Sequence, residues 1–193
     1  PPVTSGLVGM YTGESFDPSS GNIWRDISGN NNHAATSGTI YRAVDGTLRQ
    51  RVFLYGSSSL SSVINWPTNI LPSVYTLFHI ARHNGPNRGR IFTNPSTSTT
   101  NWLSGFLNAN GIAYHMGWLT GTSSYISNPS AWLLSSDGNS FYRAQGTTLS
   151  INAPGSPSYS RLAVGYYEVS DWAIATVIVY SRTLSSTEIT QVE

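Results

Sequence analysis

The chain has 193 residues, of which 39% are hydrophobic and 10% are charged, a balance typical of one compact domain rather than a disordered segment. All ten basic residues are arginines and nine acids nearly cancel them, so the net charge of +1 offers no broad basic face to nucleic acid. Cysteine is absent, which excludes disulfides and thiolate metal sites, and no apolar run is long enough to insert into a membrane.

Short apolar or alternating segments, each bounded by Gly, Pro, Asn or Ser, predict β-strands joined by turns. They cover residues 6–12, 51–56, 75–83, 90–94, 102–108, 112–120, 131–136, 140–145, 161–167 and 172–182. Because no helical period separates them, we expect an all-β fold in which two antiparallel sheets stack with their apolar faces inward.

Three joints between these strands carry turn residues and predict hairpins. They are the stretch HNGPNRG at 83–89, the pair Asn110-Gly111 and the pair Asp137-Gly138.

The strand at 75–83 contains two histidines four residues apart. On a strand that spacing corresponds to roughly 13 Å, so His79 and His83 are too far apart to bind one metal ion. Alternation favours Phe78 and Ile80 as the core set and leaves His79 on an outer or concave face.

One helix is predicted at the end of the chain. Ser185 and Glu188 have the spacing of a capping box, and Leu184 and Ile189 that of a hydrophobic staple. The chain ends near this helix without a stop signal, so we expect residues 1–193 to be a single domain cut from a longer polypeptide.

The early segment WRDISGNNNHA, residues 24–34, is too polar for a strand or helix. Asp26 and Ser28 can accept backbone N–H bonds two residues ahead and Gly29 tolerates a positive φ, which predicts a tight structural turn with Trp24 in the core. The alternative is a structural calcium ion on Asp26. Calcium needs six to eight oxygens and this loop has one acid, so the turn is favoured, and no other cofactor is expected.

The two ends of the chain also carry a family resemblance. GLVGMYTGESFD with WRDISGNNNHA, and the closing DWAIATVIVYSRTLSSTEI, resemble the laminin-G-like, concanavalin A-like lectin/glucanase superfamily over essentially the whole chain. The middle is similar to domains in surface or virion proteins of large DNA viruses of algae. The resemblance implies a jelly roll whose first and last strands pair, acting as a noncatalytic recognition module on an extracellular or virion surface.

The aromatic and arginine side chains of the middle are the candidate glycan ligands, because such groups stack on sugar rings and hydrogen-bond their hydroxyls. The candidates are Arg82, Arg90, Trp102, Tyr114, His115 and Trp118. The alternative is that the indoles fill the core and the arginines lie at a solvated hairpin tip.

A noncatalytic module is expected, and a glycoside hydrolase or lyase is the least favoured alternative. Glycoside hydrolysis needs two carboxyl groups on one face, and the nearest acids, Glu168 and Asp171, have a spacing that points them to opposite faces of a strand. The expected partners are therefore a glycan or, alternatively, a neighbouring structural protein or a second copy of the chain in a capsid, fibre or appendage. With four histidines, we also expect binding or assembly to be acid-sensitive between roughly pH 5 and 7.

Overall fold

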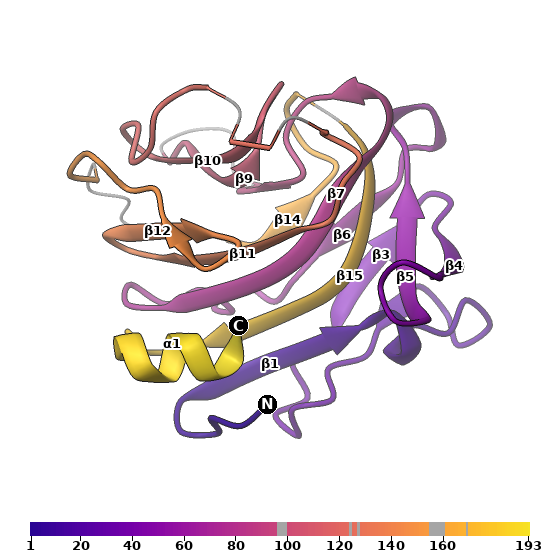
Figure 1. Cartoon of the computed structure of the whole chain (residues 1–193). Helices are drawn as coiled ribbons and strands as arrows, with labels where there is room; N and C mark the ends of the chain where they lie inside the picture. Colours follow the sequence, from indigo (N-terminus) through magenta and orange to yellow (C-terminus); the bar gives the residue numbers. More distant parts are fainter. Residues whose placement is uncertain (96–99, 124, 127, 155–160, 169) are drawn as a thin grey trace.

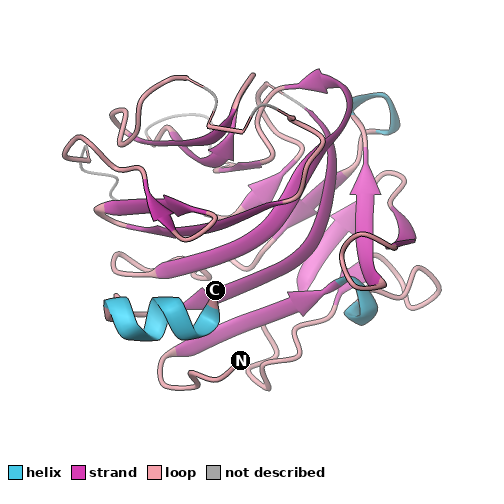
Figure 2. Ribbon diagram, in the orientation of Figure 1, coloured by secondary structure: helices cyan, strands magenta, loops and turns pink. Residues whose placement is uncertain are grey.

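The computed structural model describes residues 1–95, 100–123, 125–126, 128–154, 161–168 and 170–193. Within these ranges the chain forms two antiparallel β-sheets, two short 3-10 turns and one α-helix (Figure 2). The predicted two-sheet β-sandwich is confirmed. The helix has seven residues, and no helix in the described ranges is long and apolar enough to cross a membrane.

The larger sheet, called sheet A, has eight strands. Its order is β13 (Thr147–Thr148), β12 (Phe141–Ala144), β11 (Leu133–Gly138), β7 (Thr76–Arg88), β15 (Ser170–Tyr180), β5 (Arg51–Gly56) and β4 (Tyr41–Asp45), with β1 (Leu7–Thr12) also paired to β15. One edge of β15 pairs with β7, while the other is shared, with residues 172–174 bound to β5 and residues 176–180 to β1. The first and last strands are thus neighbours, as predicted.

The second sheet, called sheet B, has seven strands. Its order is β10 (Asn110–His115), β9 (Trp102–Phe106), β8 (Phe92–Thr93), β14 (Ala163–Val164), β6 (Val63–Asn65), β3 (Ala34–Ser37) and β2 (Ile23–Trp24). The 3-10 turns are η1 (Gly13–Ser15) and η2 (Ser58–Leu60). The main core lies between the two sheets, where Trp24, Trp102 and Trp172 are fully buried.

Each of the predicted strands overlaps an observed one. Five further strands, β2, β3, β4, β6 and β13, were not predicted; they have five residues or fewer and mostly polar or small side chains. Such strands exist because a longer neighbour supplies their hydrogen bonds, so they leave little local signal.

The predicted hairpin at 83–89 is wrong. β7 continues through this segment, its register with β15 shifts after His83, and it pairs again at Arg88 opposite Ser170; the next strand, β8, belongs to sheet B. The Asp171 carboxylate holds the segment extended by accepting a bond from the Asn87 N–H. Gly85 allows that approach, since a Cβ there would lie 2.5 Å from an Asp171 oxygen.

The other two predicted hairpins are present with shifted turns. β9 and β10 reverse around Asn108, which has a φ of 54°, and Gly111 forms a bulge in β10 with a φ of 76°. β11 and β12 are paired up to Gly138 opposite Phe141, so Asp137-Gly138 ends the strand and the chain reverses at residues 139–140.

The polar loop after β2 seals the free edge of β1. Asp26 accepts bonds from the backbone N–H groups of Met10, Ser28 and Asn32 and from the Ser28 hydroxyl, so both carboxylate oxygens are engaged. The side-chain amides of Asn30 and Asn32 donate to carbonyls of β1 at Leu7 and Val8. Side chains thus replace a missing neighbouring strand.

This geometry confirms the structural turn. Gly29 and Asn31 have φ values of 94° and 59°, and the Trp24 indole donates to the Thr12 carbonyl from inside the core. Burial opposes the charge of Asp26, but the N–H bonds from Met10 and Ser28 outweigh it and lower the pKa. In the described ranges no three His, Asp or Glu side chains cluster as a metal site would require, and both Asp26 oxygens, which the calcium alternative would use, already accept hydrogen bonds from the chain.

The chain ends in α1 (Ser186–Val192), which lies against the outer face of sheet A (Figure 1). Ser185 and Glu188 form the predicted capping box. Leu184 and Ile189 are buried in a small cluster with Phe78 and Tyr180.

Candidate functional site

Two of the six predicted glycan ligands are core residues. Trp102 and His115 are fully buried between the sheets, where the indole N–H donates to the Tyr75 hydroxyl and its ring stacks on the imidazole at 5.9 Å. Neither side chain can meet a ligand, and this corrects the prediction. Their strands run beneath the surface loops, and alternation turns both residues inward.

The buried His115 forms an ion pair. Its Nε2 lies 3.2 Å from the Asp137 carboxylate, and its Nδ1 lies 3.4 Å from the Asn139 carbonyl. Burial disfavours the imidazolium, but the charge of Asp137 and these two acceptors outweigh burial and raise the pKa of His115. This pair links two strands through the core and has no route to a ligand.

The other four predicted residues do not form one site. Arg90 is 7% exposed, and its guanidinium is held by Glu168 at 2.6 Å and by the Asn101 amide oxygen. Tyr114 and Trp118 are half-buried and pack edge to face at 5.2 Å next to sheet B, whereas Arg82 lies on β7 of sheet A.

The prediction for the faces of β7 is also wrong. Leu77, His79 and Ala81 point into the core, while Phe78 and Ile80 lie on the outer face of sheet A. The His79 ring packs 4.2 Å from Phe92 of sheet B, and Ser104 is its hydrogen-bond partner at 2.9 Å. Burial lowers the pKa of His79 to about 3 and that of His83 to about 4, so both are neutral near pH 7.

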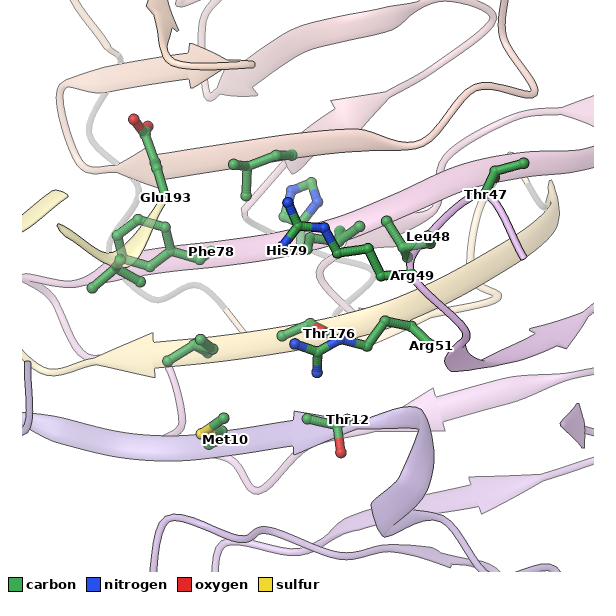
Figure 3. Close-up of a pocket in the computed structure, with 14 residues that line it drawn as sticks. Met10, Thr12, Thr47, Leu48, Arg49, Arg51, Phe78, His79, Thr176 and Glu193 are labelled. Carbon is green, nitrogen blue, oxygen red and sulfur yellow. The ribbon is translucent and has the colours of Figure 1, made fainter. Parts of the chain in front are cut away.

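The outer face of sheet A carries a groove with a cavity volume of about 560 Å³ (Figure 3). Its floor is formed by four adjacent strands, β1, β15, β7 and β11. The side chains of the floor are those of Met10, Thr12, Phe78, Ile80, Leu134, Thr176 and Ile178. The end of α1 closes one side of the groove, and the β4–β5 loop, residues 46–50, closes the other. A cavity of about 560 Å³ is within the range of small-ligand sites.

Asp45 fixes the β4–β5 loop to the sheet. One of its oxygens accepts bonds from Thr47 and Leu48, and the other accepts the Trp132 indole N–H at 2.8 Å. The bonds from Thr47 and Trp132 lower the pKa of Asp45 to about 2, so this anchor stays ionised. The loop is therefore tied to β11 across the sheet.

The same loop directs two arginines over the floor. Arg49 and Gln50 have φ values of 50° and 59°, a left-handed conformation that is uncommon for such residues. Figure 3 shows the guanidinium groups of Arg49 and Arg51 reaching across the sheet above β7 and β15. Both side chains are exposed, and neither forms an ion pair within 4 Å in the described part of the chain.

Glu193 is the only acidic residue of the groove lining. Its carboxylate is bound by the Arg143 guanidinium at 2.8 Å and by the Ser136 hydroxyl at 2.7 Å. Burial opposes its charge, but these partners outweigh it and lower the pKa of Glu193. A second carboxylate, which two-carboxylate glycoside hydrolysis requires, is absent from this lining.

An aromatic patch, defined as Tyr41, Phe53, Tyr55, Arg82 and Trp132, continues the groove along the same face. The rings of Tyr41 and Tyr55 stack at 5.2 Å, and Tyr41 is 45% exposed. The Arg82 guanidinium lies over the rings of Trp132 and Phe53, 5.0 and 5.5 Å from their centres. Leu48 and Ile80 belong both to the groove and to the cluster beneath the patch, so the two form one surface.

Comparison with known proteins gives the fold but no family. No protein-family model matches the chain, and no curated protein matches its sequence. Among solved structures, domain 4 of a GH43 extracellular arabinanase from Geobacillus stearothermophilus, in complex with arabinotriose, has a TM-score of 0.71 and 13% identity, covering 97% of this chain and 98% of that one.

Two larger proteins contain a similar domain. The binding domain of Paraclostridial Mosquitocidal Protein 1 has a TM-score of 0.64 and 16% identity, and 97% of this chain matches 51% of it. A mutant of Trypanosoma rangeli sialidase has a TM-score of 0.61 and 15% identity, with 97% of this chain matching 32% of that enzyme. This chain therefore spans about a third of the sialidase. These likenesses are compatible with a concanavalin A-like sandwich.

The acids singled out as the nearest carboxyl pair have structural partners. Glu168 binds Arg90, and Asp171 accepts bonds from the backbone N–H groups of Ser58 and Asn87. Four residues at the groove and the patch, Asp45, Arg49, Arg51 and Trp132, were not predicted. The stretch DGTLRQR at 45–51 is a turn signal followed by two arginines, and only the folded sheet shows that it faces a groove.

Proposed function

We propose that this chain is a noncatalytic carbohydrate-binding module whose ligand lies in the groove and on the aromatic patch of sheet A. The observation that carries the proposal is the stack of the exposed Tyr41 on the half-buried Tyr55, beside a groove lined by the exposed Arg49 and Arg51. A flat aromatic surface binds the apolar face of a sugar ring, and the polar groups bind its hydroxyls.

The comparisons support this proposal at the level of the fold. The arabinanase domain is matched over nearly its whole length, and its structure contains arabinotriose. The mosquitocidal protein fragment is a binding domain. The laminin-G-like character and a place on an extracellular or virion surface belong to the same proposal and rest on the sequence resemblance.

The absence of catalysis is part of the proposal. The groove lining has one carboxylate, and Arg143 neutralises it. Of the acids outside the groove, Asp26, Asp137 and Asp171 are buried and engaged in hydrogen bonds or an ion pair.

The test is a glycan array followed by titration calorimetry on the best ligand. Replacing Tyr41 and Tyr55 by alanine should weaken binding at least about tenfold, because stacking contacts contribute on the order of 1 kcal/mol each beyond the area they bury. Tyr125→Ala, at another exposed tyrosine, should leave the affinity unchanged. Silence on the array, or equal affinity of the patch variant, would refute the proposal, and a concentration-dependent oligomer with no glycan affinity would favour the assembly role.

A further inference from the structure

The charges around the groove are unequal. Its lining has Arg49 and Arg51 at the loop end and Glu193 at the helix end. Glu193 is bound by Arg143, whose guanidinium lies at the rim, so that pair contributes no net charge. Two exposed guanidinium groups, those of Arg49 and Arg51, remain in the lining without an ion-pair partner among the described residues.

Two acids lie near this end of the groove. Glu14 of η1 accepts a bond from the Val52 N–H, and Asp45, which pairs with Arg51 across β4 and β5, accepts bonds from Thr47, Leu48 and Trp132. Within the described ranges neither carboxylate forms an ion pair with Arg49 or Arg51 within 4 Å. Both guanidinium groups are therefore without an ion-pair partner in that part of the chain.

The position of the two guanidinium groups is built into the fold. Asp45 ties the loop to Trp132, which directly precedes β11, and the left-handed backbone at Arg49 turns the chain back toward the sheet. A left-handed backbone conformation at a residue other than glycine costs free energy, and such residues are often found at functional sites. Figure 3 shows both groups aimed over the floor rather than away from the molecule.

From this geometry we infer that the groove selects a saccharide carrying a negative charge, with Arg49 and Arg51 as the anion ligands. The inference rests on the proposed function and narrows its ligand class. The planar fork of arginine donates two parallel bonds to a carboxylate or a sulfate ester. The Thr176 hydroxyl and the apolar floor are left for the sugar ring, whereas the Thr47 hydroxyl donates to Asp45 and the Thr12 side chain is bonded to Glu14.

The experiment compares charged and neutral forms of the same sugar. Calorimetry at low and high salt would use trigalacturonic acid against its methyl ester, and a sulfated galactotriose against galactotriose. Where an anionic probe binds, its affinity should be at least about tenfold higher than that of its neutral partner. The Arg49→Gln/Arg51→Gln variant should bind the charged and neutral forms equally. The two arms show whether the anion is a carboxylate or a sulfate.

Arg25→Gln is the matched control, since Arg25 is exposed but lies outside the groove. Circular dichroism and the urea midpoint should be unchanged in both variants, because all three arginine side chains are exposed. Equal affinity for charged and neutral probes, or an undiminished preference in the double variant, would overturn the inference and leave the proposed function intact. Failure of every probe, together with silence on the array, would overturn both.

Discussion

The buried imidazole of His79 makes the stability of this domain sensitive to acid. Burial lowers its pKa from 6.5 to about 3, so the folded protein does not take up a proton there at pH 5, whereas the unfolded chain does. Because the pKa of His79 is lower in the folded protein than in the unfolded chain, no stability is lost above pH 6.5. The loss of stability then grows as the pH falls toward the pKa of the folded protein. At pH 5 the difference amounts to about 2 kcal/mol of lost stability.

The perturbation that isolates this effect is His79→Gln. Glutamine does not titrate, and its amide can still reach the Ser104 hydroxyl that His79 meets at 2.9 Å. The variant loses the ring contact with Phe92 and should be less stable at pH 7. Between pH 7 and 5 it should lose about 2 kcal/mol less than the natural chain.

Urea unfolding at several pH values measures this difference, with the free energy extrapolated to water at each pH. His115→Gln supplies the opposite sign. Asp137 raises the pKa of His115 in the folded protein. The stability that the protonated His115 contributes is therefore complete below pH 6.5 and is lost as the pH rises through the pKa of the folded protein. Parallel pH profiles for the natural chain and His79→Gln would refute this reasoning.

Further predictions concern the parts of the fold that depend on single side chains, and urea unfolding measures them all. Asp26→Ala leaves four donors of the loop and β1 without their acceptor and should cost about 3 kcal/mol, and a loss below about 1 kcal/mol would contradict the role of Asp26. Ser185→Ala removes the cap of α1 and should cost about 1 kcal/mol, with Thr190→Ala on the same helix as a milder control. Gly38→Ala should cost at least about 2 kcal/mol, because φ is +69° and a Cβ would lie 2.1 Å from a backbone oxygen. Gly21→Ala, with a φ of +73° and open space around it, should cost only the backbone term of about 1 kcal/mol, and similar losses at both glycines would show that the steric clash is unimportant.

Features set by contacts within a few residues could be predicted from the sequence. The cap at Ser185 and Glu188 and the turn at Asp26 depend on side chains that reach the backbone nearby, and both are present. Pairing of β1 with β15 was expected from the family resemblance alone. The two strands are about 170 residues apart in the sequence, so no local pattern indicates which residues pair.

The course of β7 through residues 83–89 could not be predicted from local signals. The segment HNGPNRG contains the residues that favour turns, but the turn it suggests does not form. Asp171, 84 residues after Asn87, accepts the Asn87 N–H and packs against Gly85, and β15 pairs with β7 on either side of the segment, at His83 and at Arg88. A tertiary contact outweighs the local preference here.

The prediction that His79 lies on the outer face of β7 was wrong for a related reason. Along TLFHIARH the residues on both faces of the strand are suited to burial, so alternation alone cannot identify the inner one. The inner set includes His79 and His83, which the core accepts as neutral imidazoles. The outer set, Phe78 and Ile80, is apolar because that face is covered as well.

How that outer face is covered explains why a groove lies there. A sheet that is apolar on both sides must bury its second face, and α1 does so over Phe78 and Ile178, while Phe53 and Trp132 do so beneath Arg82. Between these two covers the floor around Thr176 stays open, bordered by the loop that Asp45 anchors. The groove is thus the part of the second face that the chain's own helix and aromatic side chains leave uncovered, and the loop places Arg49 and Arg51 over that gap.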